Sequence, residues 1–228
     1  MCSSDLLPLA RKELGAALQE LVRRGGFEEA VVYLQVSRGS APRHRGIPAH
    51  AKPTVVMTVR SLPRAPDRLE AKAISVITLP DERWARCDIK SVGLLANVLA
   101  YHAAKKAGAD DALFVAVDGT IEESSAGNLF LVKDGALGTP PCGRKLLAGV
   151  TRLKILAAAR SAGIPCREVR ITTKELLGAD EVFLSSTTAQ ITPVGGVDGH
   201  RIGDGKPGPV TARLYEAFIR SVSGSRPG

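Results

Sequence analysis

Hydrophobic positions recur along the chain with two periods, one typical of helices and one typical of strands. Residues 7–24 place apolar side chains at helical spacing, and Gly25-Gly26 predict the end of that helix. Alternation of apolar and polar positions predicts strands over 30–38 and 52–60. The first part of the chain is therefore expected to form a small unit of one helix and paired strands.

A proline-containing segment predicts a boundary after this unit. Residues 61–67 read SLPRAPD, and two prolines within seven residues are typical of a linker. We predict a small domain over 1–61, a linker over 62–67 and a larger domain over 68–228.

The larger domain alternates predicted strands with a few helices. Asp-Gly steps at 118–119, 134–135 and 198–199 are each flanked by apolar alternation. Each predicts a hairpin, because a type I′ turn needs positive φ at both central positions. Strands are expected over 71–79 and 181–194, and helices over 91–108, 150–162, 174–178 and 210–222. The predicted fold class is α+β, with mostly antiparallel strands in the larger domain.

Composition narrows the class of protein. The chain has 228 residues, of which 44% are hydrophobic, but it contains no run of 18 apolar residues that could cross a bilayer. Its first residues lack the layout of a signal peptide, and its four cysteines have neither metal-ligand spacing nor a disulfide pattern. We expect a cytoplasmic protein with no metal site and no membrane contact.

The net charge of +8 raises the question of nucleic-acid binding. Lys and Arg are dispersed along the chain, and the densest basic segment, RGSAPRHRG at 38–46, contains no aromatic residue for base stacking. A generally basic surface without a nucleic-acid partner is the better interpretation.

Three features together suggest a pyridoxal phosphate site. The cofactor needs an amine for its aldehyde, a carboxylate for its ring nitrogen, and backbone donors at a helix start for its phosphate. Lys90 offers the amine, Glu123 the carboxylate, and the helix that opens at 149–151 the donors. Each has a simpler alternative: Lys90 as a surface lysine, Glu122 in place of Glu123, and Thr151 as an ordinary N-cap.

The order of several motifs strengthens this interpretation. From Glu123 to Arg152 the chain reads E-x-S-x-x-N-L-F, six residues, L-x-T, seven residues, L-A-G-V-T-R. This stretch resembles the signature of class IV aminotransferases, which are fold-type IV pyridoxal phosphate enzymes. With RCDIKS, YLQVSRGSAPR, EVFLSSTTAQITPV and IGDGKPGPVTARL, the chain is most similar to the D-amino-acid transaminases of that class. The resemblance extends from about residue 8 to about residue 220.

The resemblance implies roles for the residues that hold the cofactor. Lys90 would form the internal aldimine and then carry the substrate α-proton. Glu123 would pair with the pyridine nitrogen, and Leu147 would lie against one ring face, although it could equally be a core residue. Gly149, Val150 and Thr151 at the helix start would bind the phosphate together with Ser186 and Thr187, unless this Ser/Thr run is only a turn.

Substrate recognition is implied for the basic loop. In the family an arginine and a histidine of this loop reach the substrate carboxylate across a homodimer. Arg43 falls on the arginine position, while the histidine position is Arg45, with His44 beside it. Thr188 is expected to contribute further donors. The departure at Arg45 leaves the side-chain preference open.

The expected reaction is amino transfer between a D-amino acid of the D-alanine type and a 2-oxo acid such as 2-oxoglutarate or pyruvate. A branched-chain L-amino-acid transaminase and an aminodeoxychorismate lyase share the expected fold and remain alternatives. A catalytically silent fragment that only binds the cofactor is a third, because the family's first strands have no counterpart here.

The start of the chain suggests a reason for that difference. Residues 1–6 read MCSSDL, which is the translation of a common short-read sequencing adaptor, GTG-TGC-TCT-TCC-GAT-CT, from a GTG start. We therefore predict that they are an assembly artefact fused to a truncated gene. Sequencing the locus tests this expectation: a longer reading frame would support it, and native DNA encoding MCSSDL would contradict it.

Overall fold

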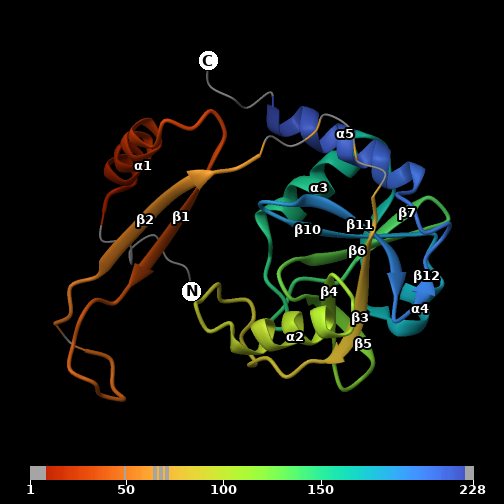
Figure 1. Ribbon diagram of the computed structural model, residues 1–228, viewed down its shortest axis with the longest axis horizontal. Helices are drawn as coiled ribbons and strands as arrows, with labels where there is room; N and C mark the ends of the chain where they lie inside the picture. Colours follow the sequence, from red (N-terminus) through yellow and green to blue (C-terminus); the bar gives the residue numbers. More distant parts are fainter. Residues whose placement is uncertain (1–8, 49, 64–65, 67–68, 70–71, 224–228) are drawn as a thin grey trace. The chain divides into compact units, whose positions relative to one another are not determined.

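The chain divides into two compact units, Met1–Ala65 and Pro66–Gly228, in a computed structural model (Figure 1). The structure describes residues 9–48, 50–63, 66, 69 and 72–223. The proposed adaptor-derived residues therefore lie outside the described part. The division falls within the predicted linker at 62–67, whose function as a linker stays a prediction.

In its described residues, the first unit contains one helix against a two-stranded antiparallel sheet. Its elements are α1 (Arg11–Gly25), β1 (Ala30–Ser37) and β2 (Thr54–Ser61). On β2, Val55, Met57 and Val59 are half-buried while the residues between them are exposed, which is the period of two that the sequence shows. Gly26 ends the helix in the left-handed conformation with φ 65°, as the glycine pair predicts.

The second unit contains most of the strands. Its elements in chain order are β3 (Ile74–Pro80), α2 (Leu95–Lys106), β4 (Asp111–Val115), β5 (Thr120–Ser124), β6 (Asn128–Lys133), β7 (Ala136–Thr139), α3 (Val150–Ser161), β8 (Cys166–Glu168), β9 (Ile171–Thr172), α4 (Thr173–Leu177), β10 (Glu181–Ser186), β11 (Gln190–Val197), β12 (His200–Arg201) and α5 (Pro209–Ser223).

These strands form a sheet that closes on itself. The neighbours run β6-β10-β11-β3-β4-β5, and a further pairing of β5 with β6 completes the ring. Pairing is parallel for β11–β3, β3–β4 and β7–β8 and antiparallel for the other pairs of this sheet. Closure satisfies strand edges that would otherwise be exposed. The predicted α+β class with mostly antiparallel strands is confirmed.

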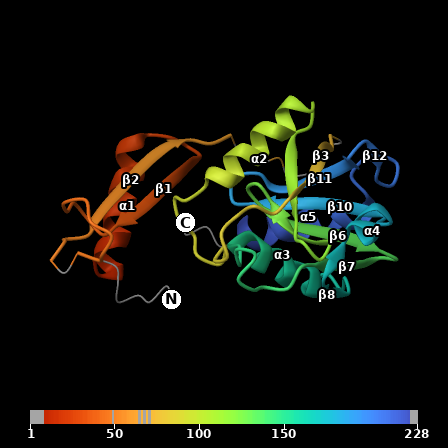
Figure 2. The same cartoon turned by 90° about the horizontal axis from the view of Figure 1, so that it is seen from below.

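Strand alternation divides the apolar side chains between the inside and the outside of this barrel. On β6, Leu129 and Leu131 join the inner cluster, whereas Phe130 packs with residues of α3 and α5. Phe130 stacks on Phe183 of β10 with ring centroids 4.8 Å apart. A separate cluster joins α2 to β3 and β4. Figures 1 and 2 show α2 on one side of the barrel and α3 with α5 on another.

Two sequence predictions need correction in detail. The helix predicted over 91–108 begins only at Leu95, because the preceding residues, including Gly93, form turns and Gly93 disfavours a helix. Hairpins form at all three Asp-Gly steps, but at 118–119 only Gly119 has positive φ. The other two steps have positive φ at both residues, as a type I′ turn requires.

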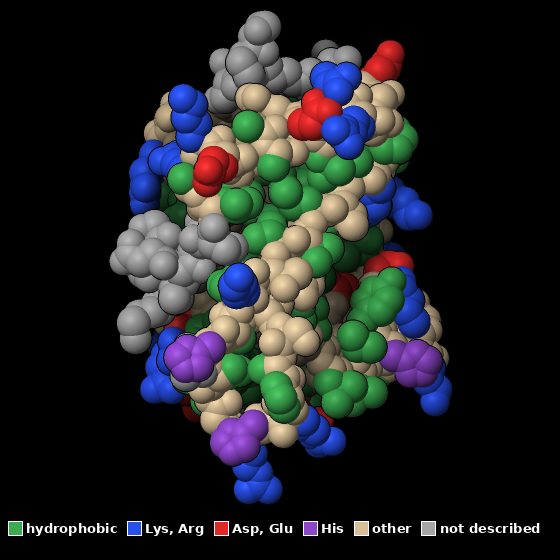
Figure 3. All heavy atoms as spheres, turned by 90° about the vertical axis from the view of Figure 1, so that its left-hand side faces the viewer, with side chains coloured by type: hydrophobic (Ala, Val, Ile, Leu, Met, Phe, Trp, Pro, Cys, Tyr) green, Lys and Arg blue, Asp and Glu red, His purple; other side chains and the backbone are tan. Residues whose placement is uncertain are grey.

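Basic side chains do not gather into one patch on the face drawn in Figure 3, where they are scattered among hydrophobic and uncharged groups. This distribution agrees with the interpretation of a generally basic surface. Within the described ranges, no helix is long and apolar enough to cross a membrane.

A buried carboxylate fixes the start of α5 and gives a test of the fold. Glu181, 7% exposed at the start of β10, accepts hydrogen bonds from the backbone N–H groups of Val210 (2.9 Å) and Thr211 (2.7 Å). We expect Glu181→Ala to lower the free energy of unfolding by about 1–3 kcal/mol, since two helix-start donors lose their acceptor.

Denaturant unfolding measures the free energy of unfolding of this variant and of a control variant, Glu216→Ala. Glu216 is an exposed carboxylate on the same helix, so its loss should cost little. Equal stability of the two variants would contradict a capping role for Glu181.

Candidate functional site

A tight turn explains why the motif places a glutamate five residues before an asparagine. Ser124 at the end of β5 accepts hydrogen bonds from Gly127 N (2.9 Å) and Ala126 N (3.3 Å) through its Oγ. Its own N–H donates to Gly127 O at 2.8 Å. The chain thereby reverses within four residues, and Glu123 becomes the cross-strand partner of Asn128.

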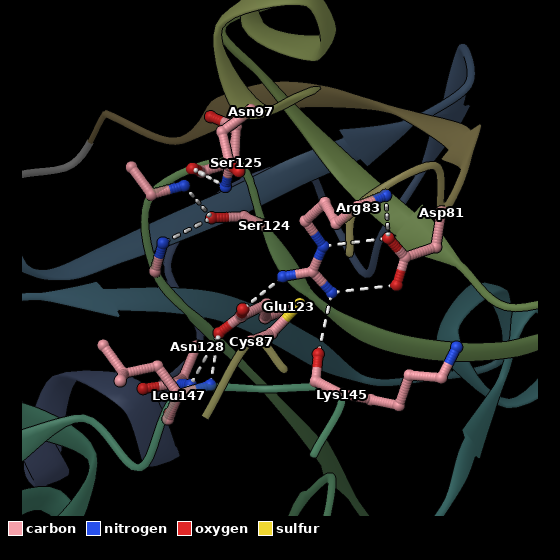
Figure 4. A network of polar contacts seen from close by, with 12 residues as sticks. Asp81, Arg83, Cys87, Asn97, Glu123, Ser124, Ser125, Asn128, Lys145 and Leu147 are labelled. Carbon is pink, nitrogen blue, oxygen red and sulfur yellow. Dashed lines mark hydrogen bonds and ion pairs between the residues drawn. The ribbon is translucent and has the colours of Figure 1, made fainter. Parts of the chain in front are cut away.

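The Glu123 carboxylate accepts hydrogen bonds from three different residues of this region (Figure 4). It is 8% exposed. Its Oε1 accepts a hydrogen bond from Arg83 Nη1, and its Oε2 accepts from Leu147 N (3.2 Å) and Asn128 Nδ2 (3.3 Å). Burial raises the pKa of Glu123 above its usual value, and the Arg83 charge opposes that rise.

Arg83 is held rigidly beside this carboxylate. Its Nε and Nη2 each lie 2.9 Å from an oxygen of Asp81, and Nη2 also donates to Lys145 O at 2.8 Å. Its guanidinium carbon lies 4.3 Å from the ring centroid of Phe114. Sequence reasoning missed Arg83 and Asp81, because two charged residues near a strand end carry no signal that they are buried together.

Leu147 and Gly149 place the start of α3 beside Glu123 and Asn128. Leu147 is half-buried, and its carbonyl accepts a hydrogen bond from Asn128 Nδ2 at 2.8 Å. Gly149 is the N-cap and Val150 the first helical residue, so the alternative that Thr151 caps the helix is wrong. A Cβ on Gly149 would lie 2.3 Å from Asn128 Oδ1, which explains the glycine.

Arg152, in the first turn of α3, connects this helix start to the neighbouring segments. It is 1% exposed, and its Nη2 donates to Pro140 O (2.8 Å) and Glu168 Oε2 (2.7 Å). The first N–H groups of a helix have no partner within the helix and favour an anion. Arg152 therefore fixes a turn whose backbone is suited to binding a phosphate.

The Ser/Thr run forms the turn between β10 and β11. Ser186 Oγ accepts a hydrogen bond from Ala189 N at 3.2 Å, and Thr187 and Thr188 are exposed. Ser185, which was not predicted as a site residue, is 2% exposed, and its Oγ has no hydrogen-bond partner among the residues that the structure describes. It lies on the same strand face as Phe183, the face that packs against α3.

Lys90 is exposed and lies in the segment between β3 and α2. Three residues earlier, Cys87 N donates to Arg144 O at 2.8 Å. The segment that carries Lys90 is thus tied to the loop that carries Leu147. The predicted basic residues Arg43, His44 and Arg45 are exposed in the first unit, in the loop between β1 and β2.

The structure therefore joins Glu123, Leu147 and the helix start at Gly149, Val150 and Thr151 through Asn128. The other predicted residues lie in other segments: Lys90 between β3 and α2, Ser186, Thr187 and Thr188 at the end of β10 and the turn after it, and Arg43, His44 and Arg45 in the first unit. A fit to pyridoxal phosphate can be tested on these groups. A buried carboxylate suits a ring nitrogen, and free helix-start amides suit a phosphate. The buried Ser185 hydroxyl, which no described group satisfies, is suited to a polar ligand. The residues fit the cofactor.

Comparison with protein families agrees with this geometry. Residues 1–197 match the family described as amino-transferase class IV. A D-alanine aminotransferase of Listeria monocytogenes is 40% identical over 220 residues, covering 95% of this chain and 75% of the relative. One from Staphylococcus haemolyticus is 40% identical over 212 residues, with 92% and 74% covered.

Solved structures give the same fold with a different named activity. The branched-chain amino acid aminotransferase of Escherichia coli superposes with a TM-score of 0.80 at 30% identity, covering 93% of this chain and 71% of that one. A branched-chain amino acid aminotransferase from T.th., solved with pyridoxamine 5'-phosphate, gives 0.86 at 31% identity, with 97% and 74% covered.

Proposed function

Because this chain belongs to the class IV aminotransferase family, we propose that it is a pyridoxal phosphate-dependent D-amino-acid transaminase. The expected reaction moves the amino group of D-alanine to 2-oxoglutarate and yields pyruvate and D-glutamate. The observation that carries the proposal is the buried Glu123 carboxylate, hydrogen-bonded to the strand and loop that lead into the α3 start. The curated relatives at 40% identity, named D-alanine aminotransferases, support the choice of the D-alanine type.

The proposed roles follow from the placement of the groups. When bound, pyridoxal phosphate supplies an aldehyde that takes up the amino group and a ring that accepts an electron pair. Glu123 would keep a proton on the ring nitrogen, and Leu147 would contact the ring. The amides of Val150 and Thr151, with Gly149, Ser186 and Thr187, hold the phosphate.

Lys90 is the proposed amine that holds the cofactor aldehyde covalently. Its Nζ would also serve as the group that takes the substrate α-proton and gives it back. Its exposed position between β3 and α2 leaves it accessible to a substrate.

A homodimer is proposed to complete the substrate site. Arg43 would bind the substrate carboxylate with its planar two-pronged guanidinium, and His44 or Arg45 would assist. Their exposure in the loop between β1 and β2 leaves these groups available to a ligand. Thr188, exposed after β10, is the proposed donor of the second unit.

A branched-chain L-amino-acid transaminase is the second candidate. Two solved structures that this chain resembles carry that name and superpose with TM-scores of 0.80 and 0.86. D-alanine and L-leucine therefore have to be compared directly.

The test measures keto-acid release by the 228-residue chain from D-alanine, L-alanine and L-leucine, with 2-oxoglutarate and pyridoxal phosphate added. Pyruvate release from D-alanine alone supports the proposal, and preference for L-leucine supports the second candidate. Cofactor absorbance without turnover of any of the three would identify a silent cofactor-binding fragment.

Arg83 gives a prediction about pH. Burial raises the Glu123 pKa and Arg83 opposes this, so Arg83→Gln should raise that pKa further. Glu123 would then stay protonated, and the enzyme less active, up to a higher pH. The acidic limb of the kcat/KM profile should therefore move to higher pH. Activity on the acidic side of the profile should fall and recover as pH rises.

The matched control is Arg86→Gln in the same segment. Arg86 is paired with Asp88 at 2.8 Å and both side chains are about one-third exposed, so the profile should stay unchanged. An unshifted profile in Arg83→Gln would show that Arg83 does not tune Glu123.

A further inference from the structure

Asn128 connects the Glu123 carboxylate to the loop entering α3. Its Nδ2 lies 3.3 Å from Glu123 Oε2 and 2.8 Å from Leu147 O. Its Oδ1 lies so close to Gly149 that a Cβ there would come within 2.3 Å. The side chain is 5% exposed, so these contacts are shielded from water.

We propose that Asn128 is a positioning residue that fixes the spacing between the Glu123 carboxylate and the phosphate-binding start of α3. This inference rests on the proposed function, since it concerns the two ends of the same cofactor site. A rigid ligand with a ring nitrogen at one end and a phosphate at the other gains both contacts only when the two protein groups are correctly spaced.

The hydrogen-bond chemistry explains why an asparagine suits this place. An amide offers two N–H donors, and here both acceptors, a carboxylate oxygen and a carbonyl oxygen, lie on the Nδ2 side. An aspartate would place a carboxylate oxygen, which can only accept, next to Glu123 Oε2 and Leu147 O. It would also bring a second negative charge close to Glu123. An alanine would leave the Leu147 carbonyl without this donor and open space behind Gly149.

The pairing of β6 with β5 and β10 also fixes the position of Asn128. As the first residue of β6 it pairs with Glu123 on β5 and with Ser185 on β10. A Cβ on the preceding Gly127 would lie 2.4 Å from Ser185 O, so the backbones approach closely there. The pairing with two strands fixes the position of Asn128, and Asn128 in turn positions the start of α3.

The test compares pyridoxamine 5'-phosphate with pyridoxamine, which lacks the phosphate, by equilibrium dialysis. Neither forms a covalent link to a lysine, so their affinity ratio measures how much the phosphate adds when the ring is bound. We expect Asn128→Ala and Asn128→Asp to reduce this ratio by about tenfold, since a buried acceptor is unpaired and the helix start shifts.

Gly149→Ala is a second variant, because its new Cβ displaces Asn128 Oδ1. Gly149 also belongs to the proposed phosphate-binding helix start, so this variant supplements the two Asn128 variants and does not replace them. It should reduce the ratio in the same direction. Thr139→Val is the matched control. Thr139 on β7 is 0% exposed, and its Oγ1 donates at 2.7 Å to the carbonyl of Leu129, the residue that follows Asn128 on β6. Its loss removes a buried side-chain hydrogen bond without touching the site, so the ratio should stay at the wild-type value.

The outcomes separate this inference from the proposed function. If the wild-type chain bound neither compound, the proposed function would fail. If the wild type favoured the phosphorylated compound and Gly149→Ala and the Asn128 variants kept that ratio, the positioning role would be excluded. An equal fall in Thr139→Val would show a general effect of core stability and would also overturn the inference.

Discussion

Lys90→Ala should abolish covalent attachment of the cofactor and reduce D-alanine turnover by about 10²- to 10⁴-fold or more, the range that a positioned acid–base group contributes. The variant should still fold, because Lys90 is exposed and lies outside the helices and strands. Cofactor should still bind non-covalently through its phosphate. Borohydride reduction of the holoenzyme followed by mass spectrometry measures the covalent adduct and its position.

Lys145→Ala is the control for this prediction. Lys145 is also an exposed lysine, and its backbone carbonyl already takes part in the network by accepting a hydrogen bond from Arg83. Removing its side chain should leave the reducible adduct and the turnover close to wild type. A reducible adduct that persisted at an unchanged level in Lys90→Ala would refute the assignment of the amine.

Glu123→Gln should reduce turnover by about 10²-fold, comparable to the loss of a preorganised charge at a site where charge develops. Glutamine keeps the shape of the side chain but cannot keep a proton on the ring nitrogen. The effect is large because the carboxylate is buried, and electrostatic interactions are stronger away from water. Cofactor binding should be affected less than turnover, so absorbance titration and steady-state kinetics are measured on the same preparation.

Glu122→Gln provides a control one residue away. Within the described part of the chain Glu122 makes no hydrogen bond to the network that holds Glu123, although the charges of Asp81, Lys145 and Arg83 act on its carboxylate. Burial also raises the Glu122 pKa, which makes it a demanding comparison. If Glu122 proved the sensitive position, the register assigned across the β5–β6 turn would be wrong.

The sequence determined the helices and the longer strands to within a few residues, because their periodicity is a local property of the chain, but it did not predict the short strands β8 and β9. Two of the three Asp-Gly steps also adopt the predicted turn, since only the two residues at the turn have to reach positive φ. At 118–119 the Asp118 side chain instead accepts a hydrogen bond from Thr120 N at 3.1 Å, and the turn differs. The start of α2 at Leu95 was also not determined by apolar spacing alone.

The sequence likewise determined the order of the candidate site groups, since the motif from Glu123 to Arg152 is contiguous. It gave no indication that Arg83 pairs with Glu123 or that Asn128 also contacts the loop entering α3. Those contacts join residues up to 40 positions apart and exist only because the closed ring of strands brings the ends of β3, β5 and β6 together. Burial of a charged pair depends on everything packed around it, and only the tertiary structure decides that.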